Sequence, residues 1–429
     1  MLFRKAFSIT LITQSLTFIL GILNTILIVR AIGPQGRGTY SILLTTVSIL
    51  SVLSSGGVIW SNTYWVGKGS GNVKYILSNG LFQAIFVLFI LLFLSSISPE
   101  KTLRIVFEGI PPGLIYLSII LVFFELEILH VNSIFLGLQN FGIYNLLLIG
   151  RAALFTPLNL LFLYGLKMNV EGVVYSWMIS AGIISVIGLV RLMKILRIRN
   201  LIMNLRQFIK SLKIGIRALV VNILGQLLLR SDLFIINWYL GLKEVGYYSV
   251  GVVVAELFLK VPGIAGTILF PKVAADSVGN INLVTMITRL MGIPLVLGVL
   301  IFILGGKTIL LVAFGKEFIS AYNPMIWILL GVLALSYHVI LDNYFAGKGY
   351  PVVTIWAPGV TLILNIGLNL LLIPKYGISG AAMSTCAAYI LLTAIKLFVF
   401  RRDNEVTYQD IFILKRLDIT GLRAIFHQK

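Results

Sequence analysis

Long apolar segments recur along the whole chain, separated by short stretches rich in glycine, proline and charged residues. Most hold about 20 residues or more, which is enough for a helix to cross about 30 Å of hydrocarbon. Cutting the chain at the glycine, proline and charge clusters predicts about twelve transmembrane helices in an all-α, polytopic membrane protein. They cover residues 7–32, 39–62, 74–97, 111–135, 142–165, 171–194, 213–239, 246–270, 287–306, 322–346, 351–373 and 378–400.

The end of the ninth predicted helix has two interpretations. The string GGKTILLVAFGKEF at residues 305–318 is apolar enough to extend helix 287–306. It is also long enough to form a separate re-entrant piece. The sequence leaves both interpretations open.

The two halves of the chain resemble each other. Residues 32–41 read IGPQGRGTYS and residues 240–249 read LGLKEVGYYS, with four identities at a constant spacing of 208. The strings NLLFLYGLKMNVEG and NLLLIPKYGISG, which begin at residues 159 and 369, are 210 apart. An offset that holds across six helices predicts two six-helix bundles of the same orientation, related by a pseudo-twofold axis along the membrane normal. Residues 32–41 are then a tight outer turn that each bundle uses once.

This repeat divides the chain into four parts. Residues 1–194 form an N-terminal six-helix lobe, and residues 213–400 form a C-terminal six-helix lobe. Residues 195–212 form a basic cytoplasmic linker, and residues 401–429 form a basic cytoplasmic tail. The tail mixes isoleucine, leucine and phenylalanine with basic residues, which indicates either an interfacial helix or disorder.

Composition agrees with this architecture. Hydrophobic residues make up 59% of the chain and charged residues 11%, with a mean hydropathy of +1.01. In soluble domains about 25% of residues are charged. The first apolar run, 7–32, is longer than a signal-peptide core, and no small-residue cleavage site follows it. We expect this run to remain in the mature protein.

The basic residues predict the orientation, because positively charged short loops stay in the cytoplasm. With the N-terminus inside, 22 basic residues fall in inner segments, seven of them from Lys396 to Lys429, against 8 in outer loops. Both termini are therefore expected to be cytoplasmic. The densest basic cluster, at 191–217, is expected to lie on an anionic inner leaflet and not to bind nucleic acid.

The sequence contains no pattern typical of a catalytic or metal site. Cys386 is the single cysteine, and the three histidines lack metal-ligand spacing. The nearest string to a phosphate-binding P-loop is Gly306-Lys307-Thr308, but residue 301 is isoleucine where the motif requires glycine. We expect a protein that is not an enzyme, with no catalytic residues, metal or cofactor.

Polar residues within the predicted helices are the candidates for function, because they are costly in lipid and usually face a cavity or a partner. Asn222, Gln226 and Arg230 step by four along the seventh helix and therefore lie near one face. That face is either a cavity wall or a hydrogen-bonded seam between the lobes. The candidate cavity-lining residues are Arg230, Asn222, Gln226, Asp232, Arg151, Asn159, Gln14, Asn24, Glu256, Lys260, Asn365 and Asn369.

Several of these charges have a structural alternative. Glu256 and Lys260 are four residues apart and can neutralise each other on one helix. Arg30 and Asp342 lie near predicted helix ends, where long side chains reach water. Glu125 and Glu127 are two residues apart and cannot both face the same direction.

Two segments carry a family resemblance. ILIVRAIGPQGRGTYSILLT, and RSDLFIINWYLGLKEVGYYSV followed by Pro262 and LFPKVA, resemble the two hallmark regions of the polysaccharide (O-antigen type) flippases. These belong to the multidrug/oligosaccharidyl-lipid/polysaccharide exporter superfamily. The resemblance implies two six-helix bundles around a central cavity that opens alternately to each side of the membrane. In this sequence Arg230 and Asp232 match the family's polar patch, and Gly241 and Tyr248 match its turn.

The resemblance also implies a substrate. It is polyprenyl-diphosphate-linked oligosaccharide, moved from the cytoplasmic to the outer leaflet for surface polysaccharide export. The location that the resemblance implies is the cytoplasmic (inner) membrane of a bacterium. The other expected partners are membrane lipids, a glycan polymerase and glycosyltransferases. A cation-coupled multidrug exporter of the same fold, a peptidoglycan lipid-precursor flippase and a membrane scaffold for glycan assembly remain alternatives. Since no nucleotide site is recognised, we expect an ion or potential gradient, or consumption of the product, to drive transport.

Overall fold

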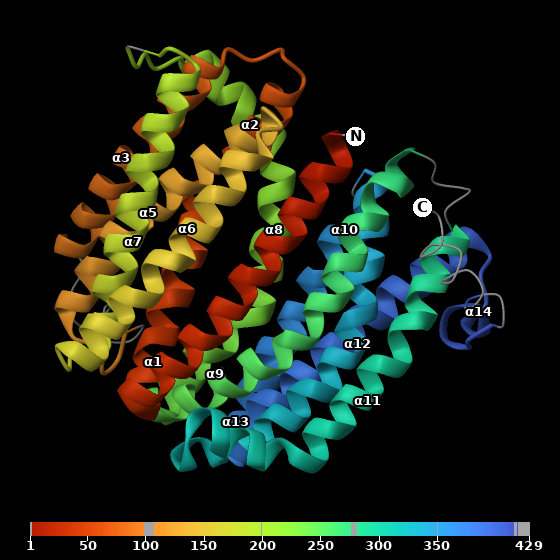
Figure 1. Cartoon of the computed structure of the whole chain (residues 1–429). Coiled ribbons are helices and arrows are strands. Elements are labelled where there is room, and N and C mark those ends of the chain that lie inside the picture. The colour runs from red at the N-terminus through yellow and green to blue at the C-terminus, as the bar shows by residue number, and fades with distance from the viewer. Residues whose placement is uncertain are drawn as a thin grey trace. The chain divides into compact units, whose positions relative to one another are not determined.

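The structure is a computed structural model that describes residues 2–97, 107–198, 200–275, 281–349, 351–415 and 418 (Figure 1). These residues form helices and connecting turns, without strands. Ten of the described helical segments are long and apolar enough to cross a membrane, so the expected all-α membrane fold is confirmed. The helices are α1 Leu2–Ser54, α2 Val58–Gly67, α3 Val73–Ile97, α5 Pro112–Gly137, α6 Phe141–Asn159, α7 Val170–Ile195, α8 Leu205–Leu240, α9 Leu242–Glu256, α10 Lys260–Ala275, α11 Ile281–Phe314, α12 Tyr322–Gly347, α13 Val353–Asn404 and α14 Tyr408–Phe412.

Two of these helices contain a break. The backbone of α1 leaves helical geometry at Gly33 (φ 65°, ψ −174°), and that of α13 does so at Gly377 (φ 59°, ψ −144°). Glycine has no Cβ and therefore adopts positive φ without strain. The 53 residues of α1 would otherwise extend about 80 Å at about 1.5 Å per residue. Both breaks lie between expected helices, but a count of twelve membrane crossings stays a prediction.

The observed boundary of α11 decides between the two interpretations of the ninth helix. The boundaries of α8, α9 and α10 differ from the expected ones. α11 continues to Phe314, so the extended form of the ninth helix is confirmed. The predicted helix 246–270 is divided into α9, a 3-10 turn at Leu257–Leu259 and α10. Pro262 explains this division, because proline lacks the N–H that would bond back to residue 258. α8 begins at Leu205, within the predicted linker.

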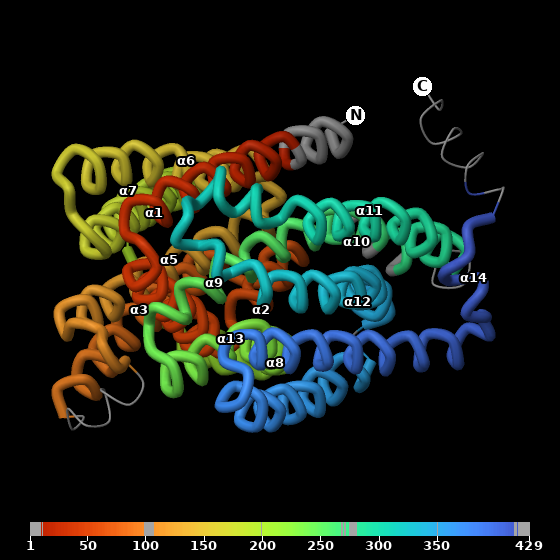
Figure 2. Tube along the Cα trace, turned by 90° about the horizontal axis from the view of Figure 1, so that it is seen from below, coloured from red at the N-terminus to blue at the C-terminus, as the bar shows by residue number. Residues whose placement is uncertain are grey.

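The chain divides into two compact units. Unit 1 contains Met1–Gln226 and Leu240–Gly246, and unit 2 contains Leu227–Tyr239 and Tyr247–Lys429, so α8 contributes to both. In unit 1, α5 packs against α1, α2, α3 and α7; in unit 2, α12 packs against α10, α11 and α13 (Figure 2). Each unit thus has a helix that packs against several others, α5 in unit 1 and α12 in unit 2.

The internal repeat is visible in the backbone. The bounds of α5 and α12 differ by 210 at both ends. Residues with positive φ also recur at this offset. The pairs, 208 to 210 apart, are Gly33 and Gly241, Gln139 and Gly349, Lys167 and Gly377, and Arg197 and Glu405. These observations support the repeat, while the pseudo-twofold axis stays a prediction.

The repeated turn contains a reciprocal contact between glycines in unit 1. A Cβ on Gly38 would lie 1.8 Å from the carbonyl oxygen of Leu242. A Cβ on Gly246 would lie 1.9 Å from the carbonyl oxygen of Pro34. Pro34 and Leu242 are themselves 208 apart, so each repeat places its glycine against the same backbone position of the other. The stretch quoted for the repeat is therefore a site of direct backbone packing between α1 and α9.

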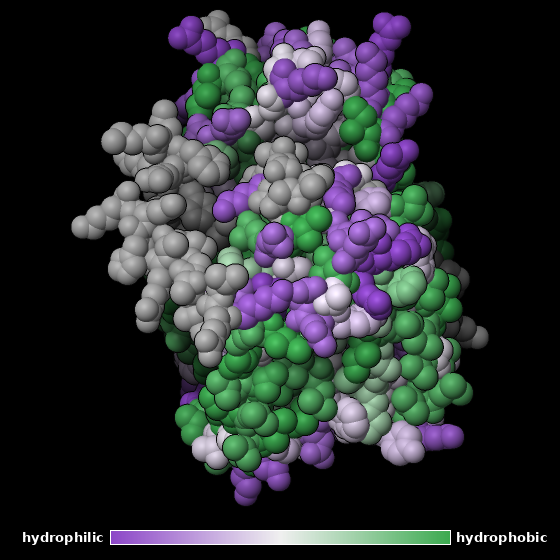
Figure 3. Space-filling view, turned by 90° about the vertical axis from the view of Figure 1, so that its right-hand side faces the viewer, coloured by the Kyte–Doolittle hydropathy of each residue, from purple (hydrophilic) through white to green (hydrophobic). Residues whose placement is uncertain are grey.

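Apolar side chains point outward from the helices. On α11 the exposed residues recur at the spacing of one helical face. They are Ile293, Val296, Leu297, Leu300, Ile301 and Leu304. Figure 3 shows a broad hydrophobic band on one face of the molecule, next to a region where hydrophilic side chains gather. Such a continuous apolar surface fits contact with lipid.

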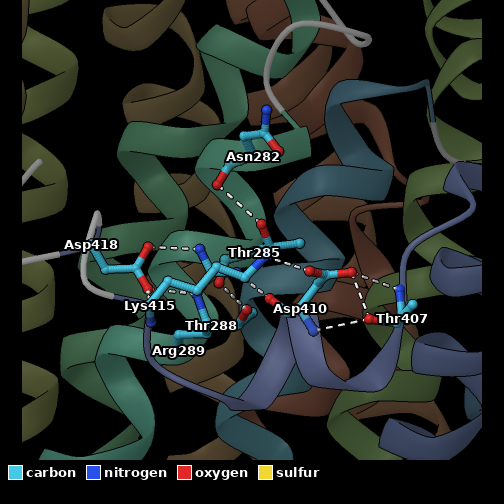
Figure 4. A network of polar contacts seen from close by, with 8 residues as sticks. All are labelled: Asn282, Thr285, Thr288, Arg289, Thr407, Asp410, Lys415 and Asp418. Carbon is cyan, nitrogen blue, oxygen red and sulfur yellow. Dashed lines mark hydrogen bonds and ion pairs between the residues drawn. The ribbon is translucent and has the colours of Figure 1, made fainter.

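A buried ion pair joins α11 to the segment that follows α13 (Figure 4). Arg289 of α11 donates from Nε to Asp418 Oδ2 at 2.7 Å and from Nη2 to Asp418 Oδ1 at 2.6 Å. Its Nη1 donates to the carbonyl oxygen of Asp410. Thr407 and Asp410 form a capping box at the start of α14. Part of the predicted tail is therefore a short helix held against α11, while residues 416–417 and 419–429 lie outside the described part.

We expect Arg289→Ala to destabilise the protein strongly. The side chains of Arg289 and Asp418 are only 6% and 4% exposed, and breaking a buried pair costs about 3–5 kcal/mol. Thermal unfolding of the purified protein in detergent measures the effect. Arg402→Ala is the matched control, because Arg402 and Asp403 are largely exposed and such pairs contribute about 0–1 kcal/mol. Equal losses in the two variants would contradict the prediction.

The same ion pair should give stability a pH dependence. The hydrogen bond from Arg289 holds the pKa of Asp418 below its usual value. A lowered folded-state pKa stabilises the fold at pH values above the ordinary aspartate pKa of about 3.9. This stabilisation is lost as pH falls through the lowered pKa. In Asp418→Asn this loss of stability at low pH should be absent, which thermal unfolding measured over a range of pH values can check.

Candidate functional site

An ion pair between α5 and α6 is the first polar centre of unit 1. Arg151 Nη1 donates to Glu125 Oε2 at 3.0 Å, and Nη2 donates to Glu125 Oε1. Trp177 of α7 donates from Nε1 to Glu125 Oε1 at 2.6 Å. The Arg151 side chain stays 30% exposed and that of Glu125 15%. Three helices therefore fix one carboxylate, while part of the guanidinium remains open.

This pair lies in the wall of a cavity of about 360 Å³ in unit 1. α5 contributes residues 125, 128, 129, 132, 133 and 136, and α6 contributes residues 144, 147, 148 and 151. Both sets repeat every three to four residues, so each is one face of a helix. Trp60 and Thr63 of α2 complete the polar and aromatic part of the wall. Glu127 instead bonds to Ser185, which confirms that Glu125 and Glu127 face different ways.

A second polar cluster in unit 1 joins α1 to α6. Asn24 Nδ2 donates to Thr156 Oγ1 at 2.8 Å, and Asn159 Nδ2 donates to Asn24 Oδ1 at 3.3 Å. Asn24 and Asn159 are almost fully buried. They lie in different predicted helices, 7–32 and 142–165, and the structure brings them together as a packed contact inside the unit.

The remaining candidates of unit 1 lie elsewhere. Gln14 and Asn222 are exposed. Asn222 Nδ2 donates to the carbonyl oxygen of Ala218 in its own helix at 2.8 Å. Gln226 Oε1 accepts from Ser48 Oγ at 3.4 Å. These contacts do not indicate a function for the three side chains. A cavity-lining role for Gln14, Asn222 and Gln226 stays a prediction.

Unit 2 contains a second arginine–glutamate pair. Arg230 of α8 lies 2.9 Å from Glu256 Oε1 and 3.0 Å from Glu256 Oε2 of α9. Their side chains are 33% and 25% exposed. Glu256 therefore pairs with Arg230, whereas the sequence offered its neighbour Lys260 as a partner; the Lys260 side chain is exposed.

Asp232 is held in a different environment from Arg230, because two residues along a helix place its side chain about 200° around the axis. It is 1% exposed and accepts from Tyr248 Oη and, at 3.2 Å, from Thr385 Oγ1. The backbone N–H of Leu233 donates to the other oxygen at 2.9 Å. This carboxylate ties together α8, α9 and α13.

The asparagines of α13 are buried inside unit 2. Asn369 Nδ2 donates to Asn365 Oδ1 at 3.1 Å. Asn365 Nδ2 and Asn369 Oδ1 have no hydrogen-bond partner among the described residues. Buried amide atoms without partners are unfavourable, so this pair would gain from a bound water or ligand group.

One buried ion pair was not expected from the sequence. Lys396 of α13 is fully buried and bonds to Asp342 of α12. The sequence assigned Lys396 to the cytoplasmic segment and let Asp342 reach water at a helix end. The structure instead pairs the two side chains within unit 2, where Lys396 is buried and the Asp342 side chain stays 38% exposed. The place of Lys396 in the count of basic residues stays a prediction. The one indication in the sequence was that Lys396, a charged residue, lies within the predicted helix 378–400.

The described residues contain no group of three or more histidine, cysteine, aspartate or glutamate side chains that could hold a metal ion. The polar centres of unit 1 and unit 2 are instead ion pairs and amide contacts. Such groups can bind hydroxyl and phosphate oxygens through hydrogen bonds and charge.

Comparison with known sequences gives consistent matches. A family model described as "Polysaccharide biosynthesis protein" matches residues 3–275. A protein of Shigella flexneri named as an O-antigen transporter is 22% identical over 398 residues, covering 88% of this chain and 92% of the relative. A protein of Haloferax volcanii named as a low-salt glycan biosynthesis flippase is 25% identical over 201 residues, covering 45% of this chain and 42% of the relative.

Solved structures share the fold. A lipid II flippase in an inward closed conformation matches with a TM-score of 0.77 and 14% identity, covering 97% of this chain and 92% of that one. A multidrug resistance transporter of the MATE family, in an inward-facing conformation, matches with a TM-score of 0.70 and 13% identity, covering 92% and 98%. These relatives and neighbours are named as transporters and flippases, not as enzymes.

Proposed function

Because this chain belongs to the polysaccharide biosynthesis protein family, we propose that it is a flippase for polyprenyl-diphosphate-linked oligosaccharide. It moves this lipid from the cytoplasmic to the outer leaflet by alternating access, for surface polysaccharide export. The observation that carries the proposal is the likeness to an O-antigen transporter over 88% of the chain. The basic-residue count supports the cytoplasmic membrane and cytoplasmic termini as part of the same proposal. A glycan polymerase and glycosyltransferases are the partners that would supply and consume the substrate.

The chemistry of the two units supports this substrate class. A glycan headgroup cannot enter hydrocarbon unassisted, since each hydroxyl loses hydrogen bonds that it makes with water. Asparagine and glutamine side chains inside the protein can replace those bonds. Arg230 is partly exposed within a membrane helix, and arginine binds phosphate oxygens in a bidentate manner. We propose that the twelve candidate residues contact the transported lipid, with Arg230 as the first phosphate contact.

The carboxylates argue against a cation-coupled multidrug exporter. Such a transporter would favour an acidic side chain open to an organic cation. Here Glu125 and Glu256 pair with arginines, and Asp232 is bonded by Tyr248 and Thr385. These three carboxylates are therefore already satisfied by the protein.

The test is transport by the purified full chain in liposomes. A fluorescent polyprenyl-diphosphate oligosaccharide is placed in one leaflet, and a membrane-impermeant quencher reports its transfer. We expect transfer that depends on the protein, gains nothing from ATP and changes rate under an imposed proton or sodium gradient. Unlabelled lipid II and a lipophilic cation serve as competitors that test the two alternative substrates. Transfer no faster than in protein-free vesicles would refute the proposal.

A further inference from the structure

The cavity of unit 1 has the composition of a small-molecule site. Its volume of about 360 Å³ lies at the lower end of the range of about 300–1,000 Å³ for such sites. Trp60 and Tyr144 give it aromatic walls, while Glu125, Arg151 and Asn132 give it polar groups. A volume of this size suits a small headgroup rather than a long glycan chain.

The polar groups lie toward opposite ends of the cavity. Glu125 and Asn132 are seven residues apart on α5, which is about 10 Å along the helix axis. Tyr144 and Arg151 have the same separation on α6. Because Glu125 bonds to Arg151, the ion pair marks one end, and Asn132 and Tyr144 lie further along the wall.

The ion pair has donors to spare but no net charge. Two nitrogens of Arg151 donate to Glu125, and a guanidinium has five N–H donors. Three N–H groups therefore remain for another acceptor, and the side chain is 30% exposed. Trp177 also donates to Glu125 and so holds the carboxylate beside Arg151. An added anion would therefore be repelled by Glu125 and an added cation by Arg151. The balance of charge favours an uncharged polar ligand.

Asn132 adds an unused amide. Its Oδ1 is buried without a hydrogen-bond partner among the described residues, so the protein does not fix the orientation of this amide. Rotation of the amide exchanges its donor and acceptor ends. A hydroxyl group is both donor and acceptor and can pair with either end.

We infer that this cavity is a subsite for an uncharged sugar unit of the transported headgroup, with Arg151 and Asn132 as its hydrogen-bonding ends and Trp60 and Tyr144 as its apolar walls. The inference rests on the proposed function, because a saccharide is the headgroup that such a flippase carries. Diphosphate, being strongly anionic, binds elsewhere in the protein.

The test measures ligand binding to the purified full chain through the change in its tryptophan fluorescence. The probes are N-acetylglucosamine and glucose as neutral sugars, inorganic pyrophosphate as an anion and tetraphenylphosphonium as a cation. We expect Asn132→Leu to weaken binding of the sugars about tenfold, the effect of one lost hydrogen bond of about 1.4 kcal/mol. The melting temperature of this variant should stay equal or rise, because replacing an unsatisfied buried amide by an apolar side chain removes a cost.

Asn145→Leu is the matched control. Asn145 also lies in unit 1 and also has an unpartnered Oδ1, but its Nδ2 donates to Thr10 and it does not line the cavity. Sugar affinity should be unchanged in this variant. Unchanged sugar affinity in Asn132→Leu, or no sugar binding by the wild type, overturns the subsite.

The transport assay separates this inference from the proposed function. If the wild type transfers lipid-linked glycan while Asn132→Leu keeps full sugar affinity, the subsite is wrong and the flippase function stands. If sugar binding depends on Asn132 while the wild type transfers no lipid-linked glycan, the cavity binds sugar but is no subsite for a transported headgroup, and the flippase function is wrong.

Discussion

Arg230→Ala should reduce surface glycan export at least about tenfold, because hydrogen bonds to a charged group contribute about 1.5–3 kcal/mol. Arg230 lies ten residues before the end of α8 at Leu240, or about 15 Å along the helix. That depth is unfavourable for a cation unless it has a counter-ion, water or an anionic ligand. Glu256 supplies the counter-ion in the present structure. We expect substrate phosphate to compete for the same guanidinium. Arg230→Lys should keep part of the activity, since the charge remains and the bidentate geometry is lost.

A double variant separates binding from folding. If Arg230 serves only to neutralise Glu256, Arg230→Ala should lower the amount of protein in the membrane, and Arg230→Ala with Glu256→Ala should restore both protein and export. If Arg230 binds substrate, the double variant restores protein level alone. Surface glycan and membrane protein are measured together, with Arg402→Ala as a control at an exposed ion pair. Wild-type glycan in Arg230→Ala at equal protein level would exclude the ligand role.

Gly38→Val should remove most folded protein from the membrane. A Cβ at Gly38 would meet a backbone carbonyl at 1.8 Å, and a carbonyl in a helix cannot rotate away as a flexible side chain can. Overpacking of ordinary cores costs about 1–3 kcal/mol, and we expect this clash to exceed that range. Membrane abundance and the size-exclusion profile in detergent measure the effect.

Gly225→Ala is the control for this clash. A Cβ at Gly225 would meet nothing within 4 Å, and alanine is favoured over glycine inside a helix by roughly 0.5–1 kcal/mol. Protein level should therefore be equal to the wild type or higher. A normal profile for Gly38→Val would show that α1 and α9 do not need their close contact.

Local sequence signals predicted the helices well, because glycine and proline interrupt the apolar runs where the chain turns. The predicted helix 111–135 corresponds to α5 at Pro112–Gly137. The division of helix 246–270 before Pro262 was missed, although proline is a known helix breaker, because the apolar run continues through it. The start of α8 at Leu205 was missed because basic side chains were taken as the mark of a loop.

Side-chain partners were much harder to predict than helices. Glu256 pairs with Arg230 rather than with Lys260, and the pair of Lys396 with Asp342 was not foreseen. Helix periodicity gives the direction of a side chain around its own axis, but not which neighbouring helix it meets. Which helices pack together depends on the tertiary structure, and the pattern of residues in one sequence does not predict it.

The recurring residues with positive φ allow the two halves of the chain to be aligned with each other, position by position. Where the second half has glycine at 349 and 377, the first half has Gln139 and Lys167, which also have positive φ. Side chains other than glycine adopt this conformation at a cost of about 1–2 kcal/mol. Each half can therefore guide the engineering of the other, because it shows at which positions φ is positive and where glycine could relieve the cost of a side chain.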